Sequence, residues 1–172
     1  MELGEAIKTR RSVRKFDPDK KVSDEQIEKL LDAAHWASSA GNLQSWFFVV
    51  VRDQKVKSQL AKAALFQMFI KNASIIIVSC ADIKRSSILY RKRGRELYAI
   101  QDATIATQNI FLTATSLGLG ACWVGAFNEE KVQEILSLKK HLRPVVIMPI
   151  GYPLEIPNPP RRRKLDKISK IV

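Results

Sequence analysis

The segment SIIIVSCA, residues 74–81, indicates the fold more clearly than any other stretch of the chain. It is short, rich in β-branched residues and apolar at consecutive positions, a pattern typical of a strand buried on both faces. Three further runs have the same character: WFFVVV (46–51), ACWVGAF (121–127) and VVIMPIG (145–151). The sequence therefore predicts a sheet that helices cover on both faces.

Helical patterns fall between these four runs. The clearest begins with the capping box SDEQ (23–26), which is followed on one helix face by Ile27, Leu30, Leu31 and Ala34. Further helices are expected over residues 2–11, 53–70, 85–118 and 128–136. This order of elements predicts a three-layer α/β or α+β fold.

The domain organisation is simple. The 172 residues fit one domain, 1–172, because no internal repeat or flexible linker divides them. The proline-rich segment GYPLEIPNPP (151–160) predicts that compact structure ends there. Residues from about 152 to 172 are expected to form an extended C-terminal arm.

Composition narrows the classes of function. Hydrophobic residues make up 46% and charged residues 27%, which is typical of a folded globular chain, and the formal net charge of +12 predicts attraction to anions. We see neither a membrane span nor a signal-peptide core. Cys80 and Cys122 lack metal-binding spacing. We expect a cytoplasmic protein with reduced thiols and no metal site.

The stretch RRSVRKF (10–16) gathers four cationic side chains around one hydroxyl group: Arg10, Arg11, Arg14 and Lys15 around Ser12. Cations at the end of a helix can simply offset its dipole, by roughly 0.3 to 1 kcal/mol each. Arginines can instead clamp a phosphate through paired, charge-assisted hydrogen bonds. A second cluster, Arg161–Arg163, follows the proline-rich segment and is either a partner in that clamp or a solvated tail.

The glycines of LGLGACW (117–123) do not form a dinucleotide fingerprint. The third glycine is absent, and the order is helix, glycines, strand rather than the reverse. Gly118 and Gly120 are better explained by a helix cap and a tight reversal. Gly125 is of more interest, because bare backbone at a strand end can closely approach a flat ring.

The loop WASSAGNLQSW (36–46) is rich in small polar residues, which often form nothing more than a turn. Its two amides, from Asn42 and Gln44, could also read the polar edge of a planar heterocycle. His35 and His141 stand alone, and no acid, base and nucleophile set is evident. That absence is natural where a bound cofactor performs the chemistry.

Four motifs in order resemble those of the FMN-dependent nitroreductase family, over essentially the whole chain. RRSVRKF resembles its flavin-phosphate motif, WASSAGNLQSW its Pro-Ser-x-x-Asn-x-Gln-Pro-Trp loop, LGLGACWVGAF its glycine-rich turn and strand, and the arginine arm its C-terminal phosphate clamp. The resemblance implies an α+β fold with a three-layer α/β/α architecture and a mixed, mostly antiparallel sheet. It also implies a homodimer with FMN at the subunit interface.

The resemblance further implies a set of cofactor contacts and no catalytic side chain. The phosphate and pyrimidine edge would be held from the two termini, with Arg14 supplying positive charge near the flavin N1/O2 edge. The loop would act on the neighbouring subunit's flavin, and backbone amides would face the N5/O4 edge. The residues so implied are Arg10, Arg11, Ser12, Arg14, Ser39, Asn42, Gln44, Gln67, Val124, Gly125, Ala126, Arg161 and Arg163.

The chain departs from the family pattern at Ser38 and Ser45, where proline is usual. Without those prolines the unfolded loop is freer, by roughly 0.4 to 1 kcal/mol per site. The chain is also short for the family and has no room for a large helical insertion over the flavin. We therefore expect a less rigid loop and an open pocket.

The expected activity is ping-pong hydride transfer from NADH or NADPH, through FMN, to a small acceptor such as a nitroaromatic or a quinone. One alternative is a flavoprotein of this fold with other chemistry, namely dehalogenation, flavin breakdown or flavin binding alone. The other is a basic nucleic-acid-binding protein, which the spread of the cations along the chain disfavours. We expect no membrane partner.

Overall fold

A computed structural model describes all residues, 1–172. Its centre is a four-stranded sheet in the order β1-β2-β4-β3, with every neighbouring pair antiparallel. The only parallel pairing is an isolated bridge between Ser12 and Ala121. The strands are β1 (Trp46–Val51), β2 (Ile75–Asp82), β3 (Gly120–Ala121) and β4 (Leu142–Gly151).

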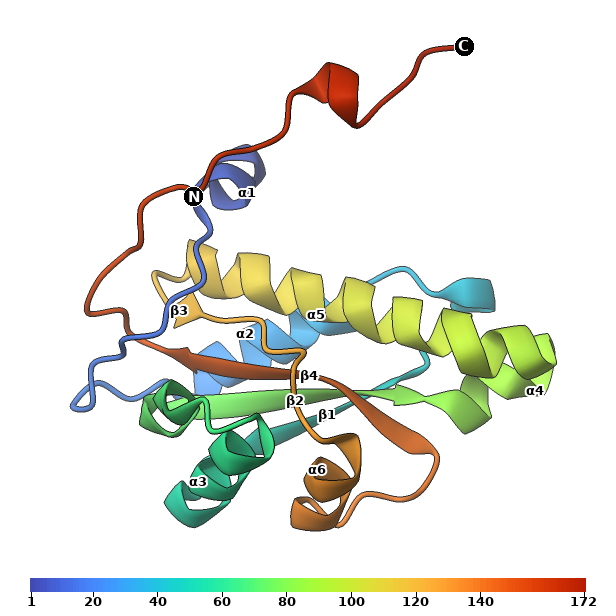
Figure 1. The fold of residues 1–172 in the computed structure, drawn as a ribbon, viewed down its shortest axis with the longest axis horizontal. Coiled ribbons are helices and arrows are strands. Elements are labelled where there is room, and N and C mark those ends of the chain that lie inside the picture. Colours follow the sequence, from blue (N-terminus) through green and yellow to red (C-terminus); the bar gives the residue numbers. More distant parts are fainter.

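Helices cover the sheet on both faces (Figure 1). The α-helices are α1 (Leu3–Thr9), α2 (Asp24–His35), α3 (Gln54–Ala63), α4 (Ile83–Arg93), α5 (Ala99–Ser116) and α6 (Glu129–Ile135). A π-helical turn, η3 (Gly94–Tyr98), joins α4 to α5. The remaining short turns are the 3₁₀ segments η1 (Ala40–Asn42), η2 (Met68–Asn72) and η4 (Leu165–Lys167).

Two apolar cores lie on opposite faces of the sheet. Alternate residues of β2 point in opposite directions, so Ile75 and Ile77 pack in a core with α2 and α5, whereas Ile76 and Val78 pack in a core with α3. Seven of the eight residues of β2 are buried. The prediction of a three-layer α+β fold with a mostly antiparallel sheet is confirmed.

Several element predictions are confirmed in detail. Ser23 caps α2 by accepting from the backbone N–H of Gln26 at 3.2 Å, which completes the capping box. The Asn128 side-chain oxygen caps α6 in the same way, by accepting from the backbone N–H of Lys131 at 2.9 Å. Gly118 follows the end of α5 with φ of +72°, which a glycine adopts without steric cost.

Three element predictions were wrong in extent. The helix expected over 53–70 ends at Ala63 and is followed by a separate turn. The strand expected over 121–127 pairs regularly only at Gly120–Ala121, with one further bridge at Val124. The helix expected over 2–11 ends at Thr9. After Ala63 apolar spacing continues although the helix has ended, whereas after Ala121 the Cys122 and Val124 N–H groups still donate to β4, at 3.2 and 3.1 Å, without forming a regular ladder.

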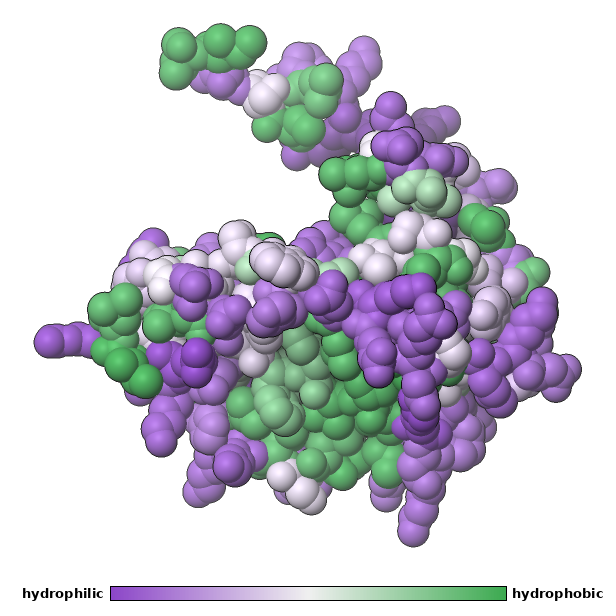
Figure 2. Space-filling model, turned by 180° about the vertical axis from the view of Figure 1, so that it is seen from behind, coloured by the Kyte–Doolittle hydropathy of each residue, from purple (hydrophilic) through white to green (hydrophobic).

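The chain beyond β4 forms the predicted extended arm, residues 152–172, whose regular structure is limited to η4. Viewed from behind, the arm rises from the body and curves over an open hollow (Figure 2). Both cysteines are buried free thiols, as expected. None of the helices combines the length and the apolar character needed to cross a membrane.

Candidate cofactor site

The arginine stretch, residues 10–16, runs in extended form between β3 and the start of the arm. The Val13 N–H donates to the Ala121 carbonyl at 2.9 Å, and the Leu154 N–H donates to the Lys15 carbonyl at 3.0 Å. Gly120 allows this close approach, because a Cβ there would lie 2.8 Å from the side chain of Val13. Backbone bonds thus fix the stretch where both ends of the chain meet.

Extended backbone sends alternate side chains of the stretch to opposite sides. Arg10, Ser12 and Arg14 lie on one side, close to Cys122. Burial raises the pKa of the Cys122 thiol, while Arg14, Ser12 and Arg10 act in the opposite direction. The structure therefore brings together three of the four phosphate-binding residues expected from this stretch.

Arg11 is directed elsewhere. Its guanidinium donates to the carbonyls of Lys8 and Arg10, both at 2.9 Å, at the C-terminal end of α1. This is the helix-capping role considered above as the plain alternative. The guanidinium of Arg11 is thus engaged by backbone carbonyls, while its charge still acts on Arg10. A role for Arg11 in binding the cofactor stays a prediction.

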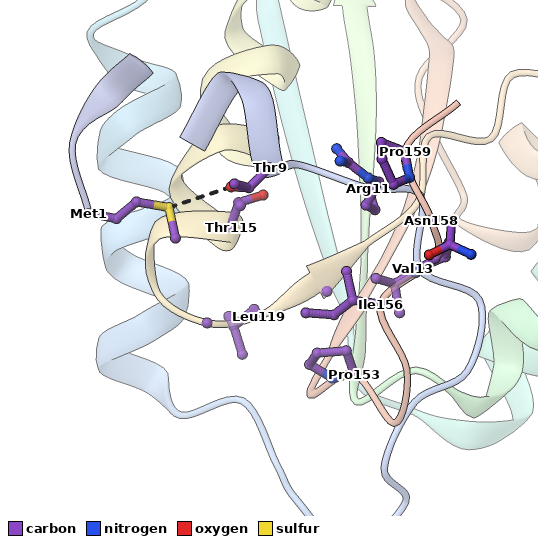
Figure 3. A pocket seen from close by; sticks show the side chains of 13 residues that line it. Met1, Thr9, Arg11, Val13, Thr115, Leu119, Pro153, Ile156, Asn158 and Pro159 are labelled. Carbon is purple, nitrogen blue, oxygen red and sulfur yellow. Dashed lines mark hydrogen bonds between the residues drawn. The ribbon is translucent and has the colours of Figure 1, made fainter. Parts of the chain in front are cut away.

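Arg11 and Val13 line a cavity of about 490 Å³ on the other side of the stretch (Figure 3). Its walls come from α1, the end of α5, β3 and the arm, whose Pro153 and Ile156 face inward. Most of this lining is apolar or proline. Because its lining is mostly apolar, the cavity does not resemble an anion site. It lies between the arm and the body of the protein.

The arginines of both termini have no acidic partner: no carboxylate forms an ion pair with Arg10, Arg14 or any of Arg161–Arg163. Burial lowers the pKa of Arg10 below its ordinary value, and the nearby positive charges of Arg162 and Arg11 lower it further. Clustered guanidiniums without a carboxylate partner keep their N–H groups and their charge available to an anion.

Two of these guanidiniums rest on aromatic rings. The Cζ atom of Arg10 lies 4.5 Å from the ring centre of Phe111 in α5, and that of Arg14 lies 5.8 Å from the ring centre of Phe69 in η2. Cation–π contacts of this kind orient a guanidinium while its N–H groups stay free to donate.

From the sequence, Arg161 and Arg163 of the arm were expected at the phosphate. Arg162 and Arg163 both donate to carbonyls within the arm, Arg162 to those of Pro160 and Arg161 at 3.2 and 3.4 Å. Arg162 is the arm residue whose charge acts on Arg10. Arg163 donates to the Lys167 carbonyl at 2.6 Å, within the arm itself. Arg161 and Arg163 stay predictions for phosphate binding, and sequence alone offered no means of choosing among three adjacent arginines.

The segment from Val124 to Ala126 lies next to η2. Gly125 and Ala126 are exposed, and a Cβ on Gly125 would meet nothing closer than the Trp123 Nε1 atom, at 3.8 Å. The Gln67 amide donates to the Ala126 carbonyl at 3.3 Å. Gln67 is therefore placed beside the open backbone of Gly125 and Ala126. The Val124 N–H, which was expected from the sequence to face the flavin, donates to the Ile147 carbonyl at 3.1 Å. The roles of Gln67, Val124, Gly125 and Ala126 in binding a cofactor stay predictions.

The amide loop, residues 38–45, is a strained turn held by side-chain bonds. Gly41, Asn42 and Gln44 all have φ between +52° and +57°. The Ser39 hydroxyl accepts from the Gln44 N–H at 2.9 Å, and Arg85 donates to the Leu43 carbonyl. The side-chain amides of Asn42 and Gln44 make no hydrogen bond within the chain and are free for a ligand.

Asp102 anchors this loop, a role that the sequence analysis missed. Asp102 lies in α5, is 2% exposed, and accepts from the Ala40 N–H at 3.0 Å through Oδ1. Its Oδ2 atom is buried and has no partner. A carboxylate in the apolar sequence of residues 99–106 was the available signal, because a buried charge requires a bonding partner.

The arginine stretch and the amide loop contact α5 at different places. The loop meets α5 at Asp102, and Arg10 meets it at Phe111, nine residues further along. At about 1.5 Å per residue this is about 13.5 Å along the helix. Figure 1 shows the loop, in cyan, and the stretch, in blue, toward opposite ends of α5.

A sequence model described as "Nitroreductase family" matches residues 7–82 and 66–152 of this chain. Two archaeal relatives are named for NADH dehydrogenase or NAD(P)H nitroreductase activity. The one from Methanothermobacter thermautotrophicus is 38% identical over 162 residues, covering 92% of this chain and 81% of the relative. The one from Archaeoglobus fulgidus is 40% identical over 151 residues, covering 86% and 83%.

Solved structures agree with these matches. The NADPH:FMN oxidoreductase from Vibrio harveyi, complexed with NAD⁺, superposes with a TM-score of 0.89 at 28% identity, over 98% of this chain and 76% of that one. A protein from Parabacteroides distasonis, also named for NAD(P)H nitroreductase activity, superposes with a TM-score of 0.86 at 31% identity, over 98% and 96%.

Proposed function

Because this chain belongs to the nitroreductase family, we propose that it is an FMN-dependent oxidoreductase that uses NADH or NADPH to reduce a small organic acceptor. The acceptor would be a nitroaromatic, a quinone or a similar compound. The observation that carries the proposal is the group of unpaired guanidiniums that the two ends of the chain bring together.

The donors of this group suit a flavin phosphate. Arg10, Arg14 and Arg162 offer charge-assisted hydrogen bonds, and Ser12 offers a hydroxyl on the same side of the chain. Burial and, after it, the charges of Arg162 and Arg11 lower the pKa of Arg10, and a phosphate dianion would offset the repulsion among these charges. Arg161 and Arg163 lie on the same arm and would add to this positive field.

The exposed backbone at Gly125 and Ala126 suits the flavin ring, because Gly125 leaves space where a side chain would otherwise stand. Bound FMN would accept a hydride from NADH or NADPH and then pass two electrons on, so that a quinone, for example, gains two electrons and two protons. Arg14 would stabilise the negative charge that reduction leaves near N1/O2, because its charge is already in place.

We further propose a homodimer in which each amide loop serves the partner's flavin. One chain holds its arginine stretch and its amide loop toward opposite ends of α5. A two-fold axis that sets two copies of α5 antiparallel would bring each loop to the other copy's arginines. Exposed apolar side chains on the arm also favour contact with a second copy of the chain. These side chains are those of Ile156, Leu165, Ile168 and Ile171.

A cytoplasmic location is part of the same proposal. Cys80 and Cys122 are both buried free thiols and form no disulfide. Free thiols of this kind suit a reducing compartment, where NADH and NADPH are also available.

The visible spectrum of the purified protein tests the proposal. We expect a yellow protein whose flavin bands bleach with NADH or NADPH and return when a quinone or a nitroaromatic is added. A colourless protein that binds DNA in a salt-dependent way would instead identify a nucleic-acid-binding protein. A yellow protein that never bleaches would identify a flavoprotein with other chemistry.

A further inference from the structure

The turn between α3 and η2 presents two large apolar side chains to solvent. Leu65 is 68% exposed and Phe66 is 73% exposed, and together they are named the apolar turn. Both residues have a left-handed backbone, with φ of +55° and +59°. Turns that need such backbone normally use glycine, asparagine or aspartate, because larger side chains are strained there.

The strain is maintained by bonds on both sides of the turn. The Phe66 N–H donates to the Lys62 carbonyl at 3.3 Å, and the Gln67 N–H donates to the Ala64 carbonyl at 3.2 Å. Ala63 and Ala64 are buried, so the end of α3 is fixed in the core. Strained backbone that carries exposed apolar groups, and is held so firmly, is typical of a ligand-contacting segment.

The turn is tied directly to the bare backbone of the proposed flavin site. The Gln67 amide bridges the Ala64 and Ala126 carbonyls, at 3.0 and 3.3 Å. The Asn128 N–H donates to the Ala63 carbonyl at 2.9 Å. The apolar turn therefore lies at the border of the open surface that begins at Gly125.

We propose that Leu65 and Phe66 form an apolar wall of the acceptor site, which selects planar aromatic acceptors over small hydrophilic oxidants. This inference rests on the proposed function. A flat ring system held between such a wall and the flavin face removes apolar surface from water on both sides, and a Phe ring adds aromatic contact. A small hydrophilic ion gains nothing from either side chain.

The test uses the holoenzyme with Leu65→Asn and Phe66→Asn combined. Asparagine tolerates a left-handed backbone, so the turn is kept while its apolar surface is removed. The matched control is Ile88→Asn, which removes a side chain that is 77% exposed on α4. Flavin content and dimer mass are measured for both variants.

We expect the double variant to raise KM for 2-methyl-1,4-naphthoquinone about tenfold and to leave turnover with ferricyanide unchanged. A titration supplies a second measurement that does not depend on turnover. The Kd of 2-naphthoate, an aromatic acid that flavin does not reduce, should rise by a similar factor. The Ile88→Asn control should have the same KM for the quinone and the same Kd for naphthoate as the wild type.

An unchanged KM for the quinone together with an unchanged Kd for naphthoate would overturn the proposal that Leu65 and Phe66 line the acceptor site. Loss of the dimer in the double variant would also overturn it, by identifying the turn as a subunit contact. Failure of the proposed function looks different, because the wild-type protein would then lack flavin or fail to reduce ferricyanide. Without flavin the apolar turn alone remains as a binding surface, so the wild type should still bind naphthoate more tightly than the double variant, and equal Kd values would overturn the inference in that case too.

Discussion

The arginine stretch and the amide loop both present polar groups that have no hydrogen-bond partner within the chain, yet they are built in opposite ways. The stretch has ordinary extended backbone, and main-chain bonds to β3 and the arm hold it. The loop has three residues in the left-handed region, and side-chain bonds hold it. Charge defines the first region and shape defines the second, so different substitutions should damage them.

The largest expected effect comes from reversing one charge in the arginine stretch. Arg10→Glu should raise the Kd for FMN by at least about 100-fold, because a donor worth about 1.5 to 3 kcal/mol becomes a repulsive group. Arg11→Glu is the matched control, since the Arg11 guanidinium is directed to the end of α1, and it should change Kd by less than about threefold. Quenching of FMN fluorescence on titration with apoprotein measures both values.

Equal losses in the two variants would contradict the alternation of side chains along the stretch. The effect would then come from the net charge of the protein, rather than from the side that Arg10 shares with Ser12 and Arg14.

A mixed-dimer experiment addresses the separation of the two regions along α5. Arg10→Glu and Asn42→Ala should each impair flavin binding in the homodimer. Refolding an equal mixture should restore about a quarter of the flavin sites, because half of the dimers are mixed and each has one intact site. Bound flavin per protomer is the measurement. No recovery above the two separate homodimers would mean that each loop serves its own chain.

Removing the anchor of the loop should have a smaller effect. Asp102→Ala removes the acceptor for the Ala40 N–H and should weaken FMN binding about tenfold, while lowering the free energy of unfolding by about 1 to 3 kcal/mol. Asp102→Asn keeps an acceptor oxygen and should recover most of the affinity. Denaturant unfolding and FMN titration measure the two quantities.

In the Asp102→Ala variant, competition between inorganic phosphate and FMN distinguishes damage to the amide loop from damage to the arginine stretch. Phosphate competes with FMN at the arginines and not at the loop, so its inhibition constant should stay as in the wild type. A weaker phosphate site in this variant would show that the two regions are coupled within the protein.

The smallest expected effect concerns Ser45, at the end of the loop. Its hydroxyl is fully buried and has no hydrogen-bond partner, at a position where the family pattern has proline. Ser45→Ala should therefore raise the free energy of unfolding by about 1 kcal/mol and leave FMN affinity unchanged. Destabilisation would mean that the hydroxyl bonds a group supplied by a second copy or a ligand.

Much of the fold could be predicted from the sequence, because its signals are local. Consecutive apolar residues at 75–78 indicated a strand covered on both faces, and Ser23 with Gln26 fixed the start of α2. The end of α3 could not be predicted, since apolar spacing continues to Ile70 while the backbone turns at Leu65. Buried contacts beyond the turn hold that conformation, and no local pattern records them.

In the candidate site, too, the local features could be predicted from the sequence and the long-range contacts could not. The motifs themselves indicated Arg10, Ser12, Arg14 and the amides of the loop as ligand-binding groups. They did not indicate that Arg11 is directed away, that Arg162 is the arm arginine near Arg10, or that Asp102 anchors Ala40. Each of these depends on residues that are distant in sequence or on which side of an extended segment faces the body.

The sequence by itself determined the composition of the site: its arginines, its amides and its bare glycine backbone, since residue type fixes charge and hydrogen-bonding capacity. Only the tertiary structure decided the arrangement. It joined the two termini through backbone bonds at residues 15–17 and 152–154, and it placed the amide loop at the other end of α5. Long-range packing sets such distances, and a chain of residue types alone does not specify them.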